Sequence, residues 1–299
     1  YAPDGLRNLS QIFADYDQDE SENLLLRNGL VIKSNNGKYY DRFRARIIFP
    51  ILNQKGQIIG FGGRVIDAAS GPKYLNSPET PLFIKSRELY NLFSARKAIR
   101  ESGRVLVVEG YMDVVMLSQY GIEYAVATLG TATTSSHIQK LLRQTDEIIF
   151  SFDGDNAGKK AAWRALETSL AHLKDGKKIS FLFLPDGEDP DSFIRKFGKQ
   201  SFELLFEKAI PLSDMLIGEL TSRVNLQSSE GRAAVIQIAK PLIQLISAPI
   251  LKLILVKQLS QLTGVNQEAL AKIFGSKLNN ASYQSNKQIE GLRLQPISP

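Results

Sequence analysis

From residue 104 to residue 184, short apolar stretches alternate with longer amphipathic ones, and this alternation constrains the fold more than any other feature. The apolar stretches are long enough for buried strands and too short for helices. Alternation at this spacing predicts right-handed βαβ units, and therefore a parallel sheet with helices on both faces. We expect strands at 104–109, 124–129, 147–152 and 179–184, and helices at 111–120, 134–144 and 157–174.

Acidic side chains follow three of the expected strands, at the point where each strand stops. Glu109 ends the first strand, with Asp113 four residues later; Asp153 and Asp155 follow the third strand, and four acids lie within 184–191 after the fourth. Because the carboxyl ends of parallel strands border the ligand crevice, we expect these acids to converge. Clustered carboxylates repel one another unless a cation neutralises them, so the pattern predicts a site for Mg²⁺ or Mn²⁺.

Each acidic group also has a purely structural explanation. Asp113 and Asp155 stand where acids cap the N-termini of helices, and 186–191 contains a Pro-Asp-Gly turn pattern. Their joint occurrence at three strand ends favours the metal site. Such a site supports phosphoryl transfer or phosphodiester hydrolysis, with Glu109 acting as a metal ligand or as a general base. The sequence shows neither a Walker-type phosphate loop nor a Ser-His-Asp arrangement.

Cysteine and histidine content narrows the kinds of site that the chain can build. The 299 residues include no cysteine and two histidines, His137 and His172, which excludes disulfides and any thiolate zinc site within this sequence. No apolar run approaches a membrane span, and no signal peptide is recognisable, so we expect a cytoplasmic protein without membrane partners. The sequence starts without Met, and we therefore expect a fragment of a longer protein.

Positive charge is concentrated in one region. Residues 33–100 carry 13 Lys and Arg against four acids, whereas the whole chain has a net charge of +6. This asymmetry is expected if a polyanion lies beside the metal site, and a solvated charged surface is the alternative. The segment 42–51 predicts a strand with its arginines on one face, returning through a turn at 53–56. The candidate phosphate contacts are Arg42, Arg44, Arg64, Lys73, Lys85 and Arg87.

The chain is expected to contain three subdomains and a tail. Residues 1–103 predict a basic α+β subdomain whose first 30 residues look helical. Glycines 60, 62 and 63 would let the backbone approach a phosphate closely, and a bulged strand is the alternative. Residues 104–200 carry the strand–helix alternation. Residues 201–278 show helical periodicity alone, and 279–299 read as a polar linker or tail. The expected class is therefore α/β with α+β and helical subdomains.

Six motifs together make the chain resemble the bacterial DNA primases, specifically the RNA-polymerase core with its Toprim fold. Three are similar to Toprim signatures, and three lie in the basic subdomain and are specific to primases; topoisomerases, recombination mediators and Toprim nucleases lack the latter. The resemblance covers about residues 1 to 275. The motifs are VEGYMD at 108–113, FDGDNAG at 152–158, LPDGEDPD at 184–191, DRFRARIIFP at 41–50, GFGGR at 60–64 and KYLNSPET at 73–80.

The resemblance implies synthesis of short RNA primers on a single-stranded DNA template by metal-assisted nucleotidyl transfer, at the replication fork in the cytoplasm. It implies a catalytic metal centre of Glu109, Asp153 and Asp155, with ligands or a second metal at Asp113, Asp189 and Asp191. It also implies that the basic candidates contact template, primer or NTPs.

Two regions of the family are expected to lie outside this sequence. The cysteine-containing zinc-binding module is absent, and the start of the polymerase subdomain looks truncated. We expect contacts with the replicative helicase and with single-stranded DNA-binding protein to be made through regions beyond the 279–299 tail. The alternatives are a Toprim nuclease or topoisomerase, and a non-enzymatic DNA-binding Toprim mediator.

Overall fold

The computed structural model describes residues 1–18, 23–66 and 72–275, which pack into two compact units. The first unit is Tyr1–Met215 and the second begins at Leu216, so the division lies inside helix α7 (Leu212–Ser222). The predicted tail at 279–299 lies outside the described residues. No described helix is long and apolar enough to cross a membrane.

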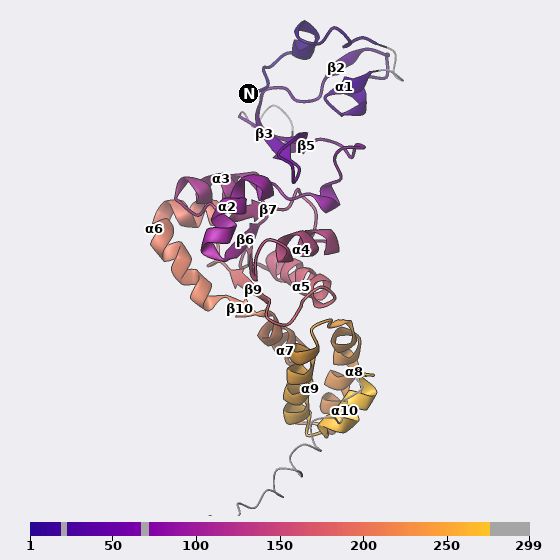
Figure 1. The fold of residues 1–299 in the computed structure, drawn as a ribbon, viewed down its shortest axis with the longest axis vertical. Helices are drawn as coiled ribbons and strands as arrows, with labels where there is room; N and C mark the ends of the chain where they lie inside the picture. The colour runs from indigo at the N-terminus through magenta and orange to yellow at the C-terminus, as the bar shows by residue number, and fades with distance from the viewer. Residues whose placement is uncertain (19–22, 67–71, 276–299) are drawn as a thin grey trace, which may run out of the picture. The chain divides into compact units, whose positions relative to one another are not determined.

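A five-stranded sheet forms the centre of the first unit. Its strand order is β10-β9-β8-β6-β7. Strands β6, β7, β8 and β9 pair in parallel, and β10 pairs antiparallel with β9 at the edge of the sheet. Helices α3 and α6 lie on one side of the sheet, and α4 and α5 on the other (Figure 1). This arrangement confirms the α/β class with a central Toprim-type sheet flanked by helices. The bounds are β6 Arg104–Val108, α3 Tyr111–Gln119, β7 Ala125–Ala127, α4 Ser135–Leu142, β8 Glu147–Phe152, α5 Asn156–Leu170, β9 Lys178–Phe183, α6 Pro190–Leu204 and β10 Ile210–Pro211.

Helix α6 begins earlier than the sequence pattern suggested. The sequence pattern gives an acidic turn at 186–191 as the structural alternative to a metal site, and helical periodicity only from residue 201, but Asp189 caps a helix whose first residue is Pro190. Proline is favoured at this position because its fixed φ suits the helix and its missing N–H leaves no intrahelical bond unmade. The predicted subdomain boundary at 200/201 therefore falls within α6, which packs against α3.

Two small antiparallel sheets precede the central sheet. In the larger one β4 pairs with both β3 and β5, and the turn at 53–56 joins β3 to β4 as predicted. The predicted helical character of residues 1–30 was wrong, because the described part contains only two four-residue helical turns. The remaining bounds are η1 Asn8–Gln11, α1 Leu24–Arg27, β1 Val31–Lys33, β2 Tyr39–Asp41, β3 Arg46–Leu52, β4 Ile58–Val65, β5 Tyr74–Asn76, η3 Lys85–Arg87 and α2 Leu92–Ser102.

The strand predicted across the first arginines also starts later than expected. Ala45 has a φ of 48°, which interrupts the extended backbone, and β3 begins only at Arg46. Arg42 and Arg44 consequently do not share the face of a strand. The Arg42 guanidinium instead donates to the carbonyl oxygen of Asn76, at 3.3 and 3.1 Å, which ties the loop before β3 to the end of β5.

Aromatic side chains join the β3–β5 sheet to the central sheet. The Tyr111 ring, at the start of α3, stacks on Phe49 of β3 at a centroid distance of 5.0 Å. Its hydroxyl donates to the Asn76 side-chain oxygen at 2.8 Å, and the Asn76 amide nitrogen donates to the Leu129 carbonyl at 3.1 Å. We call this set, with Phe83, the aromatic joint; all of its hydrophobic members are buried. It fixes the β3–β5 sheet against the carboxyl edge of the central sheet.

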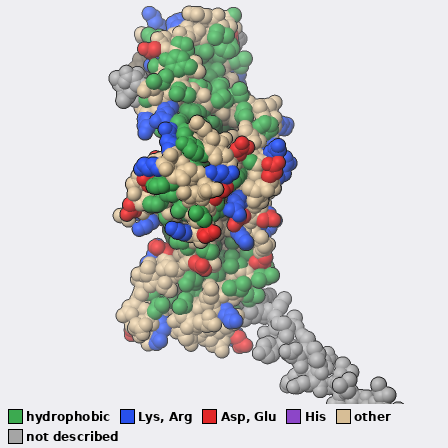
Figure 2. All heavy atoms as spheres, turned by 90° about the vertical axis from the view of Figure 1, so that its left-hand side faces the viewer, with side chains coloured by type: hydrophobic (Ala, Val, Ile, Leu, Met, Phe, Trp, Pro, Cys, Tyr) green, Lys and Arg blue, Asp and Glu red, His purple; other side chains and the backbone are tan. Residues whose placement is uncertain are grey.

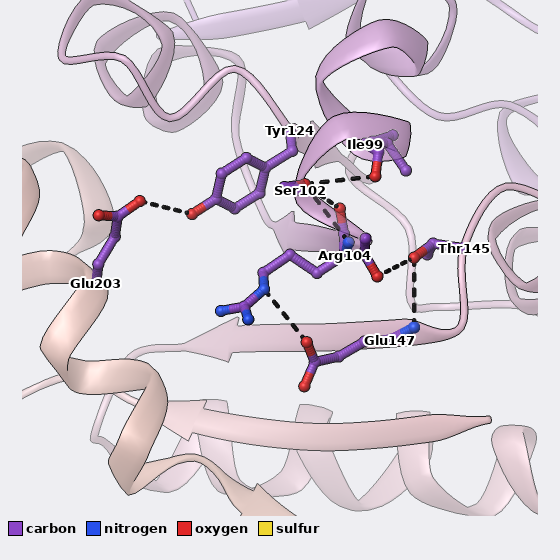
Figure 3. Close-up of polar contacts among 8 residues, drawn as sticks. Ile99, Ser102, Arg104, Tyr124, Thr145, Glu147 and Glu203 are labelled. Atoms are coloured by element: carbon purple, nitrogen blue, oxygen red, sulfur yellow. Dashed lines mark hydrogen bonds and ion pairs between the residues drawn. The ribbon is translucent and has the colours of Figure 1, made fainter. Parts of the chain in front are cut away.

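A polar network closes the opposite edge of the central sheet, where β6 and β8 begin (Figure 3). Arg104 pairs with Glu147 at 3.2 Å, and its guanidinium lies 5.6 Å from the centre of the Phe206 ring in η4 (Leu205–Lys208). The Tyr124 hydroxyl donates to Glu203 of α6 at 3.2 Å. These contacts hold α6 and its continuation against the sheet, far from the acidic ends of the strands.

The second unit is helical, as the periodicity predicted. Helices α8 and α9 pack on each other, and α10 packs on α9 around a core that includes Val235, Leu255 and Leu259. A side-chain cap at Ser228 starts α8, and Gly264, with a φ of 72°, ends α9. The bounds are α8 Ser229–Leu245, α9 Pro249–Thr263 and α10 Gln267–Ile273.

Candidate active site

A pocket of about 280 Å³ lies where β6 and β8 end, and it gathers most of the predicted acids. We call it the acidic pocket. Asp155 does not line it, but acts electrostatically on Glu109 and Asp153 within it. Its charged lining residues are Glu109, Asp113, Asp153, Asp189, Asp191, Arg64 and Lys73.

Helix capping places several of these acids. The Asp113 carboxylate accepts a hydrogen bond from the Gly110 backbone N–H at 2.9 Å, in the first turn of α3. Asp155 accepts from the Gly158 N–H at 2.7 Å, and Asp189 accepts from the Ser192 N–H at 2.6 Å. Capping and clustering are therefore not alternatives here, because the helices start at the carboxyl edge of the sheet and bring their capping acids with them.

Close packing fixes the turn that carries Asp153. A Cβ atom on Gly158 would lie 2.1 Å from the carbonyl oxygen of Asp153, and one on Gly154 would lie 2.6 Å from that of Leu184. Side chains at these positions are excluded by backbone atoms, which cannot rotate away. The glycines of the FDGDNAG motif thus let the acidic turn lie directly against α5 and the end of β9.

Burial, together with repulsion between neighbouring carboxylates, raises the pKa values of three acids in the acidic pocket. Desolvation, followed by the charge of Asp189, raises the pKa of Asp113 to about 7 despite hydrogen bonds from backbone N–H groups. Partial desolvation and the charges of Asp153 and Asp155 raise the pKa of Glu109, although the residue stays solvent-exposed as a whole. Desolvation and the charges of Asp189 and Asp155 likewise raise the pKa of Asp153. A bound cation would relieve this repulsion.

The donor atoms fit a hard cation, but the side chains as placed do not enclose one. The charged ligands that the pocket offers are carboxylates, with no thiolate or imidazole among its lining residues, which suits Mg²⁺ or Mn²⁺. Within the described ranges, no group of three or more His, Asp or Glu side chains is close enough to hold a metal ion. Enclosing a cation therefore requires carboxylate rotations, or water and phosphate oxygens in its shell.

Two of the six predicted basic residues line the acidic pocket, and the other four do not. Arg64 of β4 and Lys73 line the acidic pocket, and both lie near the face of the Tyr74 ring, at 5.7 and 5.9 Å from its centre. On the face shown in Figure 2, Lys and Arg side chains are interspersed with acids and form no continuous basic patch. Outside the pocket lie Arg42, Arg44, Lys85 and Arg87, whose contacts with nucleic acid stay predictions.

The other basic candidates make local contacts. Arg44 donates to the Asp41 carbonyl at 3.0 Å, and its guanidinium lies 5.1 Å from the centre of the Tyr40 ring. The backbone carbonyl of Lys85 contacts the buried His137 ring at 3.3 Å, and that of Arg87 accepts from Lys140. These contacts of Lys85 and Arg87 are made by their backbone carbonyl groups, and neither side chain lines the acidic pocket.

The lining residues that sequence reasoning missed include Tyr74, Met112 and Ser151. Tyr74 and Met112 lie within the KYLNSPET and VEGYMD motifs, so their motif membership was an available signal. Ser151 has no such signal. It is a buried serine inside a strand, and only the fold shows that the strand borders the pocket.

The fold and the site define a Toprim protein whose acidic crevice is completed by a basic antiparallel sheet. Family models agree over most of the chain: "DNA primase catalytic core, N-terminal domain" matches residues 1–96, and "Toprim domain" matches 103–183. A DNA primase domain of known structure from Pseudomonas aeruginosa shares 45% identity and a TM-score of 0.84, over 92% of this chain and 85% of that one. The chain belongs to the DNA primase family.

Curated relatives are longer than this chain. A DNA primase of Neisseria meningitidis is 50% identical over 299 residues, covering 100% of this chain and 49% of the relative. That of Escherichia coli K12 is 48% identical over 265 residues, covering 89% and 45%. The chain therefore spans about half the length of the curated relatives it matches. The Toprim domain of this family is generally metal-dependent.

The third family match changes one expectation about the helical unit. A model described as "DnaB-helicase binding domain of primase" matches residues 213–268. The sequence analysis places helicase contacts beyond the tail at 279–299, whereas this match lies on α7–α10. The sequence pattern gave helices there without indicating a binding role, because helical periodicity reports packing rather than partners.

Proposed function

We propose that this chain is the catalytic part of a primase, which joins ribonucleotides on a single-stranded DNA template and releases pyrophosphate. One observation supports the proposal most strongly: five carboxylates at the carboxyl edge of the central sheet share a pocket with Arg64 and Lys73, which belong to the primase-specific motifs. Acids alone would suit any Toprim protein. The basic pair adds charge-assisted donors for the phosphates of a nucleotide.

Different residues of the acidic pocket would bind phosphate, accept a proton and hold the metal ion. Arg64 and Lys73 would bind phosphate oxygens, and the raised pKa of Glu109 suits it to accept a proton from a 3′-hydroxyl or to act as a ligand. Glu109, Asp153 and Asp155 would hold Mg²⁺ or Mn²⁺, and Asp113, Asp189 and Asp191 would supply further ligands or hold a second ion. Once bound, the ion would neutralise charge that develops on the α-phosphate and lower the pKa of the attacking hydroxyl.

The partners follow from the same assignment and from related proteins. A structure described as a DnaG primase catalytic domain bound to ssDNA is 48% identical to this chain, with a TM-score of 0.81 over 87% of it and 83% of that protein. Single-stranded DNA, an RNA primer and NTPs are therefore the ligands we propose. A helicase of the DnaB kind is the proposed partner of the helical unit, and single-stranded DNA-binding protein and a cytoplasmic fork location stay predictions.

Removing charge from the site tests the proposal. Glu109→Gln and Asp153→Asn change charge at nearly constant shape, so each should nearly abolish incorporation of labelled NTPs on single-stranded DNA with saturating Mg²⁺. Glu101→Gln, on the exposed face of α2, is the matched control and should incorporate normally. Near-normal rates in folded Glu109→Gln or Asp153→Asn protein would refute the site. DNA cleavage without synthesis would favour the nuclease or topoisomerase alternative, and binding alone the mediator.

A further inference from the structure

The short basic turn η3 lies against helix α4, and none of its residues lines the acidic pocket. Each of its three backbone carbonyl groups contacts a different side chain of α4 or of its N-cap. These side chains are three residues apart, so they lie on the same side of the helix. We call them the α4 clamp. The contacts are Thr134 with the Ser86 carbonyl at 2.6 Å, His137 with that of Lys85 at 3.3 Å, and Lys140 with that of Arg87.

The buried ring of His137 joins the first turn of α4 to η3. Its Nδ1 atom accepts from the Thr134 backbone N–H at 3.3 Å, so the ring proton lies on Nε2, which donates to the Lys85 carbonyl. Burial lowers the pKa of His137, which keeps the ring neutral, as this pattern of hydrogen bonds requires. The imidazole therefore holds the backbone of η3 without adding a charge to it.

Two acidic side chains near η3 already have partners, whereas its two cations do not. Glu88 pairs with Lys140 at 2.9 Å, and these side chains are only 19% and 15% exposed. Glu79 accepts from the Lys85 backbone N–H at 3.1 Å. Neither the ammonium of Lys85 nor the guanidinium of Arg87 makes an ion pair or a hydrogen bond with any residue that the structure describes. The turn therefore presents positive charge that these neighbouring acids do not neutralise.

The pairing of Lys140 with Glu88 has an electrostatic effect beyond anchoring the turn. The carbonyl contacts would hold η3 whatever side chains it carried, but Glu88 is the carboxylate next to Arg87 in the chain. Its pairing with Lys140 removes it as a competing partner for that cation. A cation on a fixed backbone also loses less conformational freedom on binding than one on a mobile loop. Such cations suit charge-assisted hydrogen bonds to phosphate.

We propose that the α4 clamp holds η3 as a contact for the phosphate backbone of single-stranded nucleic acid, and that Lys140 keeps Glu88 from pairing with Lys85 or Arg87. The inference rests on the proposed function and deepens it, because it names positioning residues for two of the predicted phosphate contacts. The phosphates of a free nucleotide have the same chemistry. Because η3 does not line the acidic pocket, we assign the contact to a strand that extends beyond this pocket.

Rescue by a second substitution tests the role of Lys140 without relying on catalysis. Lys140→Met nearly keeps the length of the side chain and removes its charge, so Glu88 becomes free to pair with Arg87. Binding of a labelled single-stranded oligonucleotide, measured by fluorescence anisotropy without NTPs, should weaken about fivefold. The log–log salt slope should fall by about 0.7, the value of one phosphate contact. Adding Glu88→Gln to Lys140→Met should restore both values, which would not happen if Lys140 itself contacted the strand.

The chain offers a matched control and a variant that leaves Lys140 in place. Lys97→Met removes the partner of Glu101, 3.8 Å away on the exposed face of α2, and should change neither the affinity nor the salt slope. Arg87→Met, at an exposed position, should reproduce the losses of Lys140→Met, and it keeps the test available if Lys140→Met does not fold. Thermal melts verify the folding of each variant.

The possible results separate this inference from the proposed function. Unchanged oligonucleotide binding by Arg87→Met, or a double variant that binds as weakly as Lys140→Met, would overturn the inference. Weaker binding of ATP with Mn²⁺ in equilibrium dialysis, without any loss of oligonucleotide binding, would overturn it in favour of a nucleotide contact. Normal incorporation by Glu109→Gln would refute the proposed function itself. An inactive Glu109→Gln together with unchanged oligonucleotide binding by Arg87→Met would overturn only the role of η3.

Discussion

Asp113→Asn should stabilise the protein at alkaline pH, because the native fold holds the proton of this carboxyl more tightly than the unfolded chain does. The pKa of Asp113 rises from its ordinary 3.8 to about 7 in the fold. Stability linked to that proton is fully present below about pH 4 and is lost as the pH rises to about 7. Asparagine resembles the protonated acid and can still accept from the Gly110 N–H, so the variant should not share this loss.

The size of the effect follows from the pKa difference. A difference of about 3 corresponds to about 4 kcal/mol of unfolding free energy, since each pKa unit is worth about 1.4 kcal/mol. The pocket is open to water, which screens the repulsion, so we expect about 2 kcal/mol at pH 8. In a unit of this size that corresponds to a rise in melting temperature of about 4 to 8 °C.

Thermal unfolding followed by circular dichroism at pH 5 and pH 8, with EDTA present, measures the effect. The gap between Asp113→Asn and the unsubstituted protein should be small at pH 5 and open at pH 8. Asp4→Asn, at an exposed position near the N-terminus, is the control and should show no gap at either pH. A variant that melts at or below the unsubstituted protein at pH 8, or an equal gap at both pH values, would refute the reasoning.

Three further predictions concern the cation, the aromatic joint and the basic pair. Added Mg²⁺ should raise the melting temperature at pH 8 more in the unsubstituted protein than in Asp113→Asn, and an equal rise would place the cation elsewhere. Gly62→Ala should lower the unfolding free energy measured in urea by about 1 to 3 kcal/mol, because its Cβ atom would lie 2.4 Å from the Tyr111 ring; an unchanged value would show that the ring can move. Arg64→Ala and Lys73→Ala should each weaken single-stranded DNA binding and lower the salt dependence by about 0.7 in log–log slope, unlike Lys97→Ala on α2; a flat salt dependence in the unsubstituted protein would mean that the basic region is only a solvated surface.

Periodicity predicted the central fold because burial on a sheet imposes it directly. The strand that ends at Glu109 and the strand 147–152 were expected at nearly the observed bounds, since apolar residues there have no other stable environment. The start of α6 was missed for the opposite reason: Asp-Pro-Asp is compatible with a turn and with a helix N-terminus, and packing against α3 decides between them.

The candidate site was predictable in its acids and only partly in its cations. Strand ends share an edge by topology, so Asp153 and Glu109 could be grouped without coordinates. The basic residues come from loops and an antiparallel sheet, where sequence spacing does not set position. The positive φ of Ala45 prevents Arg42, Arg44 and Arg46 from lying on one face of a strand. Lys85 and Arg87 lie in η3 and do not line the pocket.

The aromatic joint determines where this polypeptide can be cut. Tyr111 and Leu129 belong to the central sheet and its connections, whereas Phe49 and Phe83 come from before residue 104. A fragment that begins at residue 104 would keep every strand of the central sheet yet expose the joint's apolar face to water, and would also lose the Asn76 hydrogen bonds. Contiguous exposed apolar surface promotes association. Such a fragment should self-associate in gel filtration, whereas one that begins before β3 should remain a monodisperse species.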